Sequence, residues 1–493
     1  MNMKKTLTIL LFLSLASSML AQVVYADYSD PDVCEGTEGD YWLTASSFQC
    51  TPGLPILHSN DLVHWELVNY AVESLFPAEH YNTVQHGCGV WAPSIRRHGD
   101  TYYIYWGDPD YGVFMVQTSN PRGRWSEPVL VMEGKGVIDT CPLWDEDGRC
   151  YLVNGWANSR CGFNSVLTVR ELSPDGTKVI GKPILVYDGQ LEGNHTIEGP
   201  KFYKRDGYYY ILAPAGGVEK GWQVALRSKN VYGPYESKTV FNQDGIHQGG
   251  WVESGFICFQ EKAAYGRILH LLDVKMKDGW PMMSVSKNNK LTTPSIAPSE
   301  RLAYQWHANY QDVFGFPISQ GMRVYGHNVS SNFKSLWEVP NLYLKKFEGE
   351  TFVDTLRMVI TAKADGDESG FVIMGRDYYR LSVELQNEQF VLKRIICKNA
   401  DEGALETGET IAMIKARKYG AGAKVNYECR VDVRIQCDKG AVCHLAYSTD
   451  GKSYISLPIS FQAREGKWIG AKYGVFSIAP KGASKGWVDL TLN

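Results

Sequence analysis

Short runs of aromatic and β-branched residues recur through the first half of the chain, and each one follows a turn glycine. The segments are GDYWLTAS from Gly39, GDTYYIYWG from Gly99, DGRCYLVNG around Gly148, DGYYYILAP around Gly207 and YGRILHLLD around Gly266. A turn glycine before such a run predicts the second strand of a β-hairpin. Successive glycines lie roughly 50 to 60 residues apart, a spacing typical of four-stranded propeller blades with generous loops. The pattern therefore predicts a β-propeller of five blades.

A second motif recurs at a constant place in these units. HSNDLVHW (58–65), QTSNPRGRW (117–125) and RSKNVYGPY (227–235) each combine Ser with Asn or Asp and then an aromatic residue. Each begins about 20 residues after its turn glycine, which predicts a hairpin between the outer strands of the blade. Unrelated β-turns would not repeat in both spacing and order.

Three acidic residues share one register in these units. Counting nine positions back from the turn glycine leads to the start of the strand that enters each hairpin. At this point three units carry a carboxylate and two an apolar residue, namely Asp30, Asp139 and Glu198 against Val90 and Ile257. The innermost strands of a propeller surround its central channel, so we expect the three carboxylates to converge there.

Converging carboxylates indicate acid–base chemistry. Like charges at close range and apolar surroundings raise the pKa of one member of such a group. One carboxyl group can then stay protonated near neutral pH while another is ionised, which is what glycoside hydrolysis requires. Caps of the blade turns, or a cation site, are the alternative uses of the three residues.

The second half of the chain has a different pattern. It follows residues 286–300, SKNNKLTTPSIAPSE, a polar stretch that predicts a linker or a last propeller loop. In CRVDVRIQC (429–437), Val431, Val433 and Ile435 alternate with polar residues, as in a strand with one buried face. YSTDGKSYISL (447–457) predicts a hairpin at its Asp-Gly pair. We expect an all-β protein with a propeller over 22–300 and a lectin-like jelly-roll β-sandwich over 301–493.

The chain begins with the pattern of a secretory signal over residues 1–21, where Lys4 and Lys5 precede a short apolar run and small residues follow. The run is too short for a membrane anchor, so we expect an exported protein, periplasmic or extracellular, with no membrane insertion. The formal net charge is −4 at pH 7 and no basic block occurs, which argues against nucleic acid as a partner.

Export would permit disulfides among the eleven cysteines. Cys437 and Cys443 could bridge a hairpin, and the odd count leaves at least one thiol free. No pair of cysteines and no His/Cys cluster has the spacing of zinc ligands, so scattered buried thiols fit the pattern better.

Seven short motifs occur in order along the propeller half: YSDPDV (28–33), SSFQCTPG (46–53), VWAPSI (90–95), VIDTCPLWDEDG (137–148), TIEGPKFY (196–203), IHQGGWV (246–252) and YGR (265–267). Together they resemble glycoside hydrolase family 43, from Tyr25 to about Pro281. The resemblance is closest to β-xylosidase and α-L-arabinofuranosidase members with a C-terminal, concanavalin A-like β-sandwich. It implies a five-bladed propeller that acts on arabinose- and xylose-containing glycans.

The resemblance also implies catalytic roles. Asp30, which precedes Pro31, matches the general base that activates the attacking water. Glu198 matches the general acid, and Asp139 matches the second aspartate, which raises the pKa of the acid and orients it. Inversion is expected because acids on the first and fourth units face each other across the channel, with room for a water molecule between them.

Further residues match positions that contact sugar. Phe48 and Trp91 match aromatic residues that line the pocket, Arg267 matches an arginine that binds sugar hydroxyls, and His247 matches a channel histidine near a bound cation or water. Trp91 could instead be a core residue, Arg267 could pair with an acid, and His247 could be a satisfied core histidine. Cys50 stands where many relatives carry an aromatic residue, which leaves the wall of the pocket and the substrate open.

The stretch GKWIGAKYGVF (466–476) resembles the one from which relatives send an aromatic loop to the mouth of the active site. An exo-acting enzyme needs a channel that is closed on one side, and an aromatic residue from a second domain can close it and stack on a sugar ring. Trp468 is the candidate for this lid. The same stretch also alternates like a buried strand, which would place Trp468 in the sandwich core.

Taken together, these patterns predict an exported, inverting exo-glycosidase that removes terminal α-L-arabinofuranosyl or β-D-xylosyl residues from plant polysaccharides or oligosaccharides. No cofactor is expected to be required, although the channel could hold a structural calcium ion. A non-catalytic sugar-binding propeller and a structural scaffold are the alternatives. Neither alternative needs a carboxylic acid with a raised pKa, so the three carboxylates in register favour the enzyme.

Overall fold

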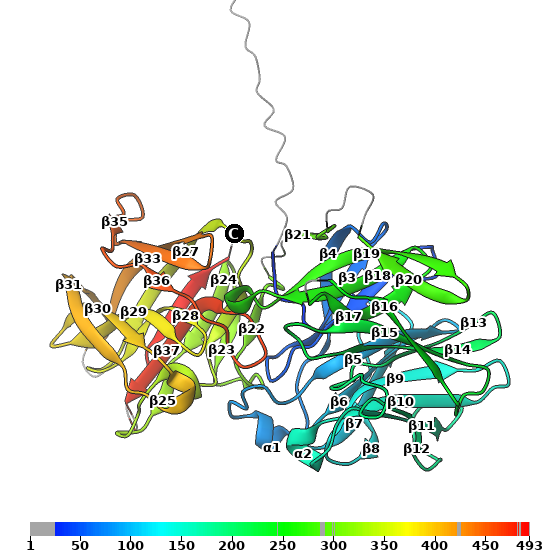
Figure 1. The fold of residues 1–493 in the computed structure, drawn as a ribbon. Coiled ribbons are helices and arrows are strands. Elements are labelled where there is room, and N and C mark those ends of the chain that lie inside the picture. The colour runs from blue at the N-terminus through cyan, green and yellow to red at the C-terminus, as the bar shows by residue number, and fades with distance from the viewer. Residues whose placement is uncertain are drawn as a thin grey trace, which may run out of the picture.

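The computed structural model describes residues 25–243, 245–285, 291–297, 299, 301–421, 425–480, 482 and 485–492. Within these residues the chain forms two β-domains that lie side by side, a propeller on the right of Figure 1 and a sandwich on the left. The signal sequence expected over residues 1–21 lies outside the described residues.

The propeller has five antiparallel blades of four strands each, as the sequence predicts. Blades one and two are β1 (Asp32–Glu35), β2 (Tyr41–Thr44), β3 (Gly53–Ser59) and β4 (His64–Val72), then β5 (Trp91–His98), β6 (Thr101–Asp108), β7 (Gly112–Thr118) and β8 (Val129–Glu133). Blade three is β9 (Val137–Trp144), β10 (Cys150–Trp156), β11 (Val166–Leu172) and β12 (Ile184–Asp188), and blade four is β13 (Lys201–Arg205), β14 (Tyr208–Ala215), β15 (Trp222–Ser228) and β16 (Glu236–Phe241). Blade five is β17 (His247–Val252), β18 (Gly255–Glu261), β19 (Arg267–Lys277) and β20 (Trp280–Ser284).

The turn glycines mark the first hairpin in four of the five blades. Gly39, Gly99, Gly148 and Gly207 each separate the first strand of a blade from the second, with positive φ angles of 59° to 82° that suit glycine. The prediction is wrong for Gly266, which lies one strand later, between β18 and β19. A glycine followed by an apolar run is typical of any β-hairpin, so the pattern does not show which two strands of the blade the hairpin joins. Ile257, the residue counted back from Gly266, is therefore in β18 rather than at the channel.

The outer hairpins are also where the second motif predicts them, between the third and fourth strands of blades one, two and four. In each one a hydroxyl oxygen accepts a hydrogen bond from the backbone N–H two residues later: Ser59 from Asp61, Thr118 from Asn120 and Ser228 from Asn230, at 3.0–3.1 Å. This local bond explains why a hydroxyl residue recurs at the turn.

The second domain consists of two packed sheets of the concanavalin type, as expected. One sheet contains β22 (Tyr304–Trp306), β25 (His327–Val329), β26 (Tyr343–Lys346), β28 (Glu368–Met374), β29 (Tyr378–Gln386), β30 (Gln389–Cys397), β31 (Thr407–Ile414) and β37 (Lys472–Pro480). The other contains β23 (Gly315–Ile318), β24 (Gly321–Tyr325), β27 (Phe352–Ala362), β32 (Arg417–Tyr419), β33 (Asn426–Asp438), β34 (Val442–Ser448), β35 (Ile455–Ser456), β36 (Phe461–Gln462) and β38 (Trp487–Thr491). In β33, Val431, Val433 and Ile435 are buried between the sheets, which confirms the alternation.

The two domains share a continuous interface. After blade five, β21 (Ser295–Ala297) runs parallel to β4 on blade one, and the next strand, β22, already belongs to the sandwich. The backbones of Thr51 and Trp306 exchange two hydrogen bonds, of 3.2 and 2.6 Å. The Asn309 side chain binds both the N–H and the C=O of Leu75, at 2.7 and 2.9 Å. These paired polar groups are buried, so the contact positions the sandwich precisely on the propeller.

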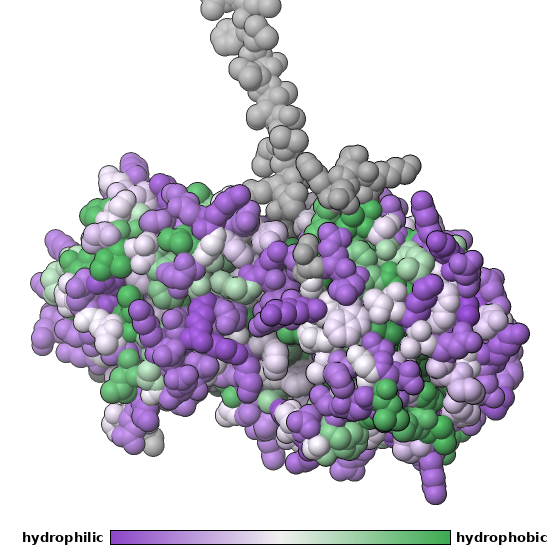
Figure 2. Space-filling view, viewed as in Figure 1, coloured by the Kyte–Doolittle hydropathy of each residue, from purple (hydrophilic) through white to green (hydrophobic). Residues whose placement is uncertain are grey.

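The surface is mostly hydrophilic on the face shown in Figure 2, and one apolar group on it lies over β11 and β12 at the lower right. Ile184 and Leu185 of β12 contribute to the exposed apolar surface. The α-helices of the described ranges, α1 (Ala78–Tyr81) and α2 (Asn158–Cys161), are single turns, and no helix in those ranges is long and apolar enough to cross a membrane.

The eleven cysteines are all free thiols, and all but Cys88 and Cys161 are buried. Cys437 and Cys443 lie directly opposite each other in β33 and β34 but are not bridged. Most of the cysteines are therefore buried free thiols, which is the interpretation that the sequence favours.

Candidate active site

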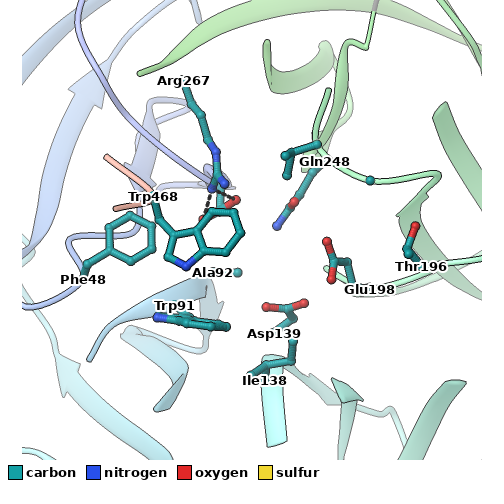
Figure 3. Close-up of a pocket in the computed structure, with 13 residues that line it drawn as sticks. Phe48, Trp91, Ala92, Ile138, Asp139, Thr196, Glu198, Gln248, Arg267 and Trp468 are labelled. Carbon is teal, nitrogen blue, oxygen red and sulfur yellow. Dashed lines mark hydrogen bonds and ion pairs between the residues drawn. The ribbon is translucent and has the colours of Figure 1, made fainter. Parts of the chain in front are cut away.

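A cavity of about 280 Å³ opens at one end of the propeller channel. This volume is close to the lower end of the range for small-molecule sites, which is about 300–1,000 Å³. Its lining includes all seven residues predicted for catalysis and sugar contact, namely Asp30, Phe48, Trp91, Asp139, Glu198, Arg267 and Trp468. Figure 3 shows the aromatic rings of Phe48, Trp91 and Trp468 on one side and the carboxyl groups of Asp139 and Glu198 on the other.

The channel-facing residues are brought in by unusual backbone turns. The innermost strands of blades one to five each have a residue with φ between 34° and 58° within two positions of the strand start, namely Asp30, Ala92, Asp139, Gly199 and Gln248. Only glycine adopts this left-handed conformation without a cost, which for other residues is about 1 kcal/mol or more. Strained backbone positions therefore recur around the propeller axis, next to the active-site residues.

Asp30 is buried and held by two partners. Ser46 Oγ donates a hydrogen bond to Asp30 Oδ2 at 2.7 Å and accepts one from the backbone N–H of Ala92 at 2.8 Å. Arg267 Nη1 donates to both carboxylate oxygens, at 2.9 and 3.0 Å. Hydrogen bonds and a positive charge favour the ionised carboxylate, so this arrangement suits a base.

Asp139 and Glu198 are linked through one backbone group. The N–H of Gly199, the residue after Glu198, donates to Asp139 Oδ2 at 2.7 Å. Burial raises the pKa of Asp139 to about 6; the Gly199 N–H opposes that shift, and the negative charge of Asp30 adds to it. Burial, and then the negative charges of Asp139 and Asp30, raise the pKa of Glu198 to about 8. The exposed part of Glu198 faces the cavity (Figure 3), so near neutral pH its carboxyl group presents a proton there.

The aromatic side of the cavity comes from both domains. Trp91 of β5 is fixed by its indole N–H, which donates to the C=O of Gly87 at 2.9 Å. Trp468 of the sandwich lies in the loop before β37, has its ring edge-on to Trp91 at 6.4 Å, and is 46% exposed. The guanidinium of Arg267 lies 5.8 Å from the Trp468 ring centre. Trp468 is therefore a wall of the cavity and not a core residue of the sandwich, which excludes the alternative reading of this stretch.

Asp27 ties the Trp468 loop to the catalytic strands, and nothing in the sequence pattern singles it out. Its Oδ2 accepts the backbone N–H of Gly470 at 2.9 Å, and its Oδ1 accepts the backbone N–H of Arg267 at 2.9 Å. The N–H of Tyr28 in turn donates to the C=O of Arg267 at 3.0 Å. One buried carboxylate thus joins the strand of Asp30, the start of β19 and the loop of the second domain.

His247 lies beside the cavity rather than in its lining. It is buried, its Nδ1 is 2.7 Å from the C=O of Gly245, and burial lowers its pKa to about 4. Across the described ranges, no group of three or more His, Cys, Asp or Glu side chains is arranged to hold a metal ion. A calcium ion in the channel near His247 stays a prediction.

Several residues of the cavity were missed by sequence reasoning. Gln248, Thr196 and Val218 line it, together with Ala92, Ile138 and Gly217. The nine-residue register does not find Gln248 even when the fifth blade is aligned on its first turn, because nine positions before Ser254 is Gly245. Ser46 carries no signal of its own, because its function depends on a strand pairing that brings it beside Asp30.

Comparison with known proteins identifies the family of this chain. The family described as "Glycosyl hydrolases family 43" matches residues 21–281, more than half of the chain. The protein belongs to glycosyl hydrolase family 43. Residues 297–491 match the "Beta xylosidase C-terminal Concanavalin A-like domain" that accompanies it. The chain is accordingly a glycoside hydrolase of the xylosidase and arabinosidase type.

Relatives within family 43 carry both activities in their names. A protein of Xylanibacter ruminicola that carries a beta-xylosidase name is 36% identical over 466 residues, which covers 90% of this chain and 84% of that protein. A non-reducing end alpha-L-arabinofuranosidase of Bacteroides ovatus is 34% identical over 255 residues, 48% of this chain and 45% of that protein. The crystal structure of a xylan beta-1,4-xylosidase from Bacillus halodurans has a TM-score of 0.75 at 19% identity and covers 95% of this chain and 99% of that one. This last likeness shows the fold.

We expect Trp468→Ala to lower kcat/KM for a pentoside substrate by about tenfold, about 1.4 kcal/mol, with little change in Tm. The reason is that the ring walls the cavity but is half exposed and carries little of the sandwich core. Phe316→Ala removes a similarly exposed aromatic outside the cavity lining and serves as the control. A large loss of Tm with unchanged kinetics would contradict this assignment.

We expect Asp27→Asn to lower kcat/KM by about tenfold as well, because one end of the amide must turn its NH₂ group toward a backbone N–H of Arg267 or Gly470. If Asp27 acts through the Trp468 loop, the double variant Asp27→Asn/Trp468→Ala loses less than the product of the two single effects. Steady-state kinetics of the four proteins measure this coupling. Fully multiplicative losses would show that Asp27 does not position the loop.

Proposed function

We propose that this family 43 protein is an exported, inverting, exo-acting glycosidase that removes terminal β-D-xylosyl or α-L-arabinofuranosyl residues from plant polysaccharides or oligosaccharides. The observation that carries the proposal is the contrast between two carboxyl groups of one cavity. Asp30 is bound by Arg267 and Ser46 in a form that suits an ionised base, while the raised pKa of Glu198 keeps its proton. Such a contrast defines an acid and a base for glycoside hydrolysis.

The reaction follows from these two groups. Asp30 accepts a proton from a water molecule as the water oxygen forms a bond to the anomeric carbon. Glu198 donates its proton to the glycosidic oxygen as the bond from the anomeric carbon to that oxygen breaks. The negative charge of Asp139 raises the pKa of Glu198 and so keeps the proton on it. Asp139 also accepts a hydrogen bond from the N–H of Gly199, the residue that follows Glu198. The leaving group carries the proton from Glu198 and the released sugar carries the hydroxyl of the water, and no covalent sugar–enzyme bond is formed. Asp30 then loses its proton to solvent and Glu198 takes one up, which restores the starting state.

The shape of the cavity supports exo action on a single terminal sugar. Its small volume, and a wall contributed by Trp468 of the second domain, leave room for one ring beside Phe48 and Trp91. The guanidinium of Arg267 lines the same space and has N–H groups that can bind sugar hydroxyls. Relatives named for xylose and for arabinose release support a pentose in this position. The signal-like residues 1–21 support export.

The test of the proposal is hydrolysis of 4-nitrophenyl β-D-xyloside and 4-nitrophenyl α-L-arabinofuranoside side by side. We expect turnover of at least one, and Asp30→Asn and Glu198→Gln to lose activity on xylan or arabinan fragments by about 10³-fold with an unchanged fold. Glu253→Gln, in the turn between β17 and β18, is the matched control. Sugar binding without turnover by the unmodified protein would instead favour a carbohydrate-binding propeller.

We further expect inversion at the anomeric carbon, because the proposed acid and base come from blades one and four and face each other across the channel. Inverting enzymes hold the two groups about 6.5–9.5 Å apart to admit a water molecule. Proton NMR of the first-formed sugar, recorded before mutarotation, identifies the anomer. A retained anomer or a trapped glycosyl-enzyme would overturn the mechanism.

A further inference from the structure

A lysine is buried in the channel beneath the cavity. Lys201, the first residue of β13 in blade four, is completely buried. Its ammonium group donates to the C=O of Pro93 at 2.7 Å and to Ser94 Oγ at 2.9 Å, and both of these partners belong to β5 in blade two. Both partners are neutral, so they do not compensate the charge. A buried ammonium is costly unless a negative charge lies close to it.

The path of this side chain passes blade three. Blades two and four are not neighbours, because the inner strand β9 of blade three packs against both β5 and β13. A side chain that reaches from β13 to β5 must cross the channel face of β9. Asp139 lies on that strand, and its Oδ2 is already bound by the N–H of Gly199, two residues before Lys201. The ammonium group is therefore placed next to the Asp139 side of the site.

The other cations of the channel are already paired. Arg96 Nη1 is 2.6 Å from Asp32 Oδ2, and Arg267 Nη1 is 2.9 Å from Asp30 Oδ1. Asp139 forms no ion pair of this kind within the described ranges, and the positive charges of Lys201 and then Arg267 lower its pKa against the effect of burial. The titratable or charged groups around Asp139 and Lys201 are Asp30, Asp32, Arg96, Cys141, Glu198, Tyr203, His247 and Arg267.

We infer that Lys201 is the built-in cation of this channel, a positioning residue whose ammonium charge keeps Asp139 ionised so that the proton of the pair stays on Glu198. The inference rests on the proposed hydrolytic function and deepens it. Arg96 then compensates Asp32, Arg267 compensates Asp30 and Lys201 compensates Asp139, whereas Glu198 forms no ion pair within the part of the chain that the structure describes. That imbalance, rather than any special property of a glutamate, makes Glu198 the acid.

The direction of the expected pH effect follows from the charges. Activity requires ionised Asp139, so the acidic limb of the kcat/KM profile falls as the pH drops through the pKa of Asp139. Removing the positive charge of Lys201 raises that pKa, because an ionised carboxylate then lacks its counter-charge. Removing a positive charge cannot favour ionisation of Glu198. The alkaline limb of the kcat/KM profile should therefore not move to lower pH.

The experiment is the pH profile of kcat/KM for Lys201→Met, measured on whichever pentoside the unmodified protein hydrolyses better. We expect the acidic limb to move up by about one pH unit. Ser94→Ala is the matched control, since it removes a hydrogen-bond partner of Lys201 but leaves the charge, and its acidic limb should stay in place. An unmoved limb in Lys201→Met would overturn the inference and leave Lys201 as a packing residue.

A second measurement does not depend on activity. If Lys201 compensates Asp139, the double variant Lys201→Met/Asp139→Asn should be more stable toward urea than Lys201→Met alone, or should fold where the single variant does not. A double variant no more stable than the single one would overturn the inference. Failure of the unmodified protein to hydrolyse either pentoside would instead refute the proposed function, because the comparison of stabilities does not depend on activity.

Discussion

The cost of burying carboxyl groups governs the active site of this family 43 protein. Removing a carboxylate from water costs several kcal/mol unless charge and hydrogen bonds replace the water. At Asp30 these are supplied by Arg267 and Ser46, and at Asp139 by the Gly199 N–H and the charge of Lys201. Glu198 forms no ion pair with any residue that the structure describes, and its raised pKa keeps its proton. Which carboxyl group acts as the acid and which as the base therefore follows from how unevenly positive charges and hydrogen bonds compensate the carboxyl groups of the site.

The propeller provides the geometry on which this compensation depends. Each inner strand has a left-handed residue within two positions of its start. The positions are strained for Asp30, Asp139 and Gln248, and such strain persists only where the surrounding structure holds it. In a propeller the neighbouring blades hold each inner strand from both sides, so five short strands can present polar groups at one level of the channel.

The sandwich is part of the active site because of a few polar contacts. Asp27 receives hydrogen bonds from the backbones of Arg267 and Gly470, and the sandwich loop then places Trp468 over the cavity. The Asn309–Leu75 and Thr51–Trp306 hydrogen bonds also hold the sandwich against blade one. These bonds join segments more than 200 residues apart in sequence, so the shape of the sugar pocket is a property of both domains together.

The sequence by itself determined the elements whose causes are local. Turn glycines, hydroxyl-bearing turns and alternating strands act within a few residues, so the hairpins of four blades, the outer turns and the buried face of β33 could all be predicted. Asp30, Asp139 and Glu198 could be found because a propeller repeats its geometry along the chain. Only the tertiary structure decided what depends on distant segments: that Gly266 belongs to a later hairpin, that Trp468 lines the cavity rather than the core, and that Asp27, Gln248 and Lys201 lie at or beneath the site. Burial, charge compensation and contacts between domains arise only when the blades close around the channel, and no local pattern encodes them.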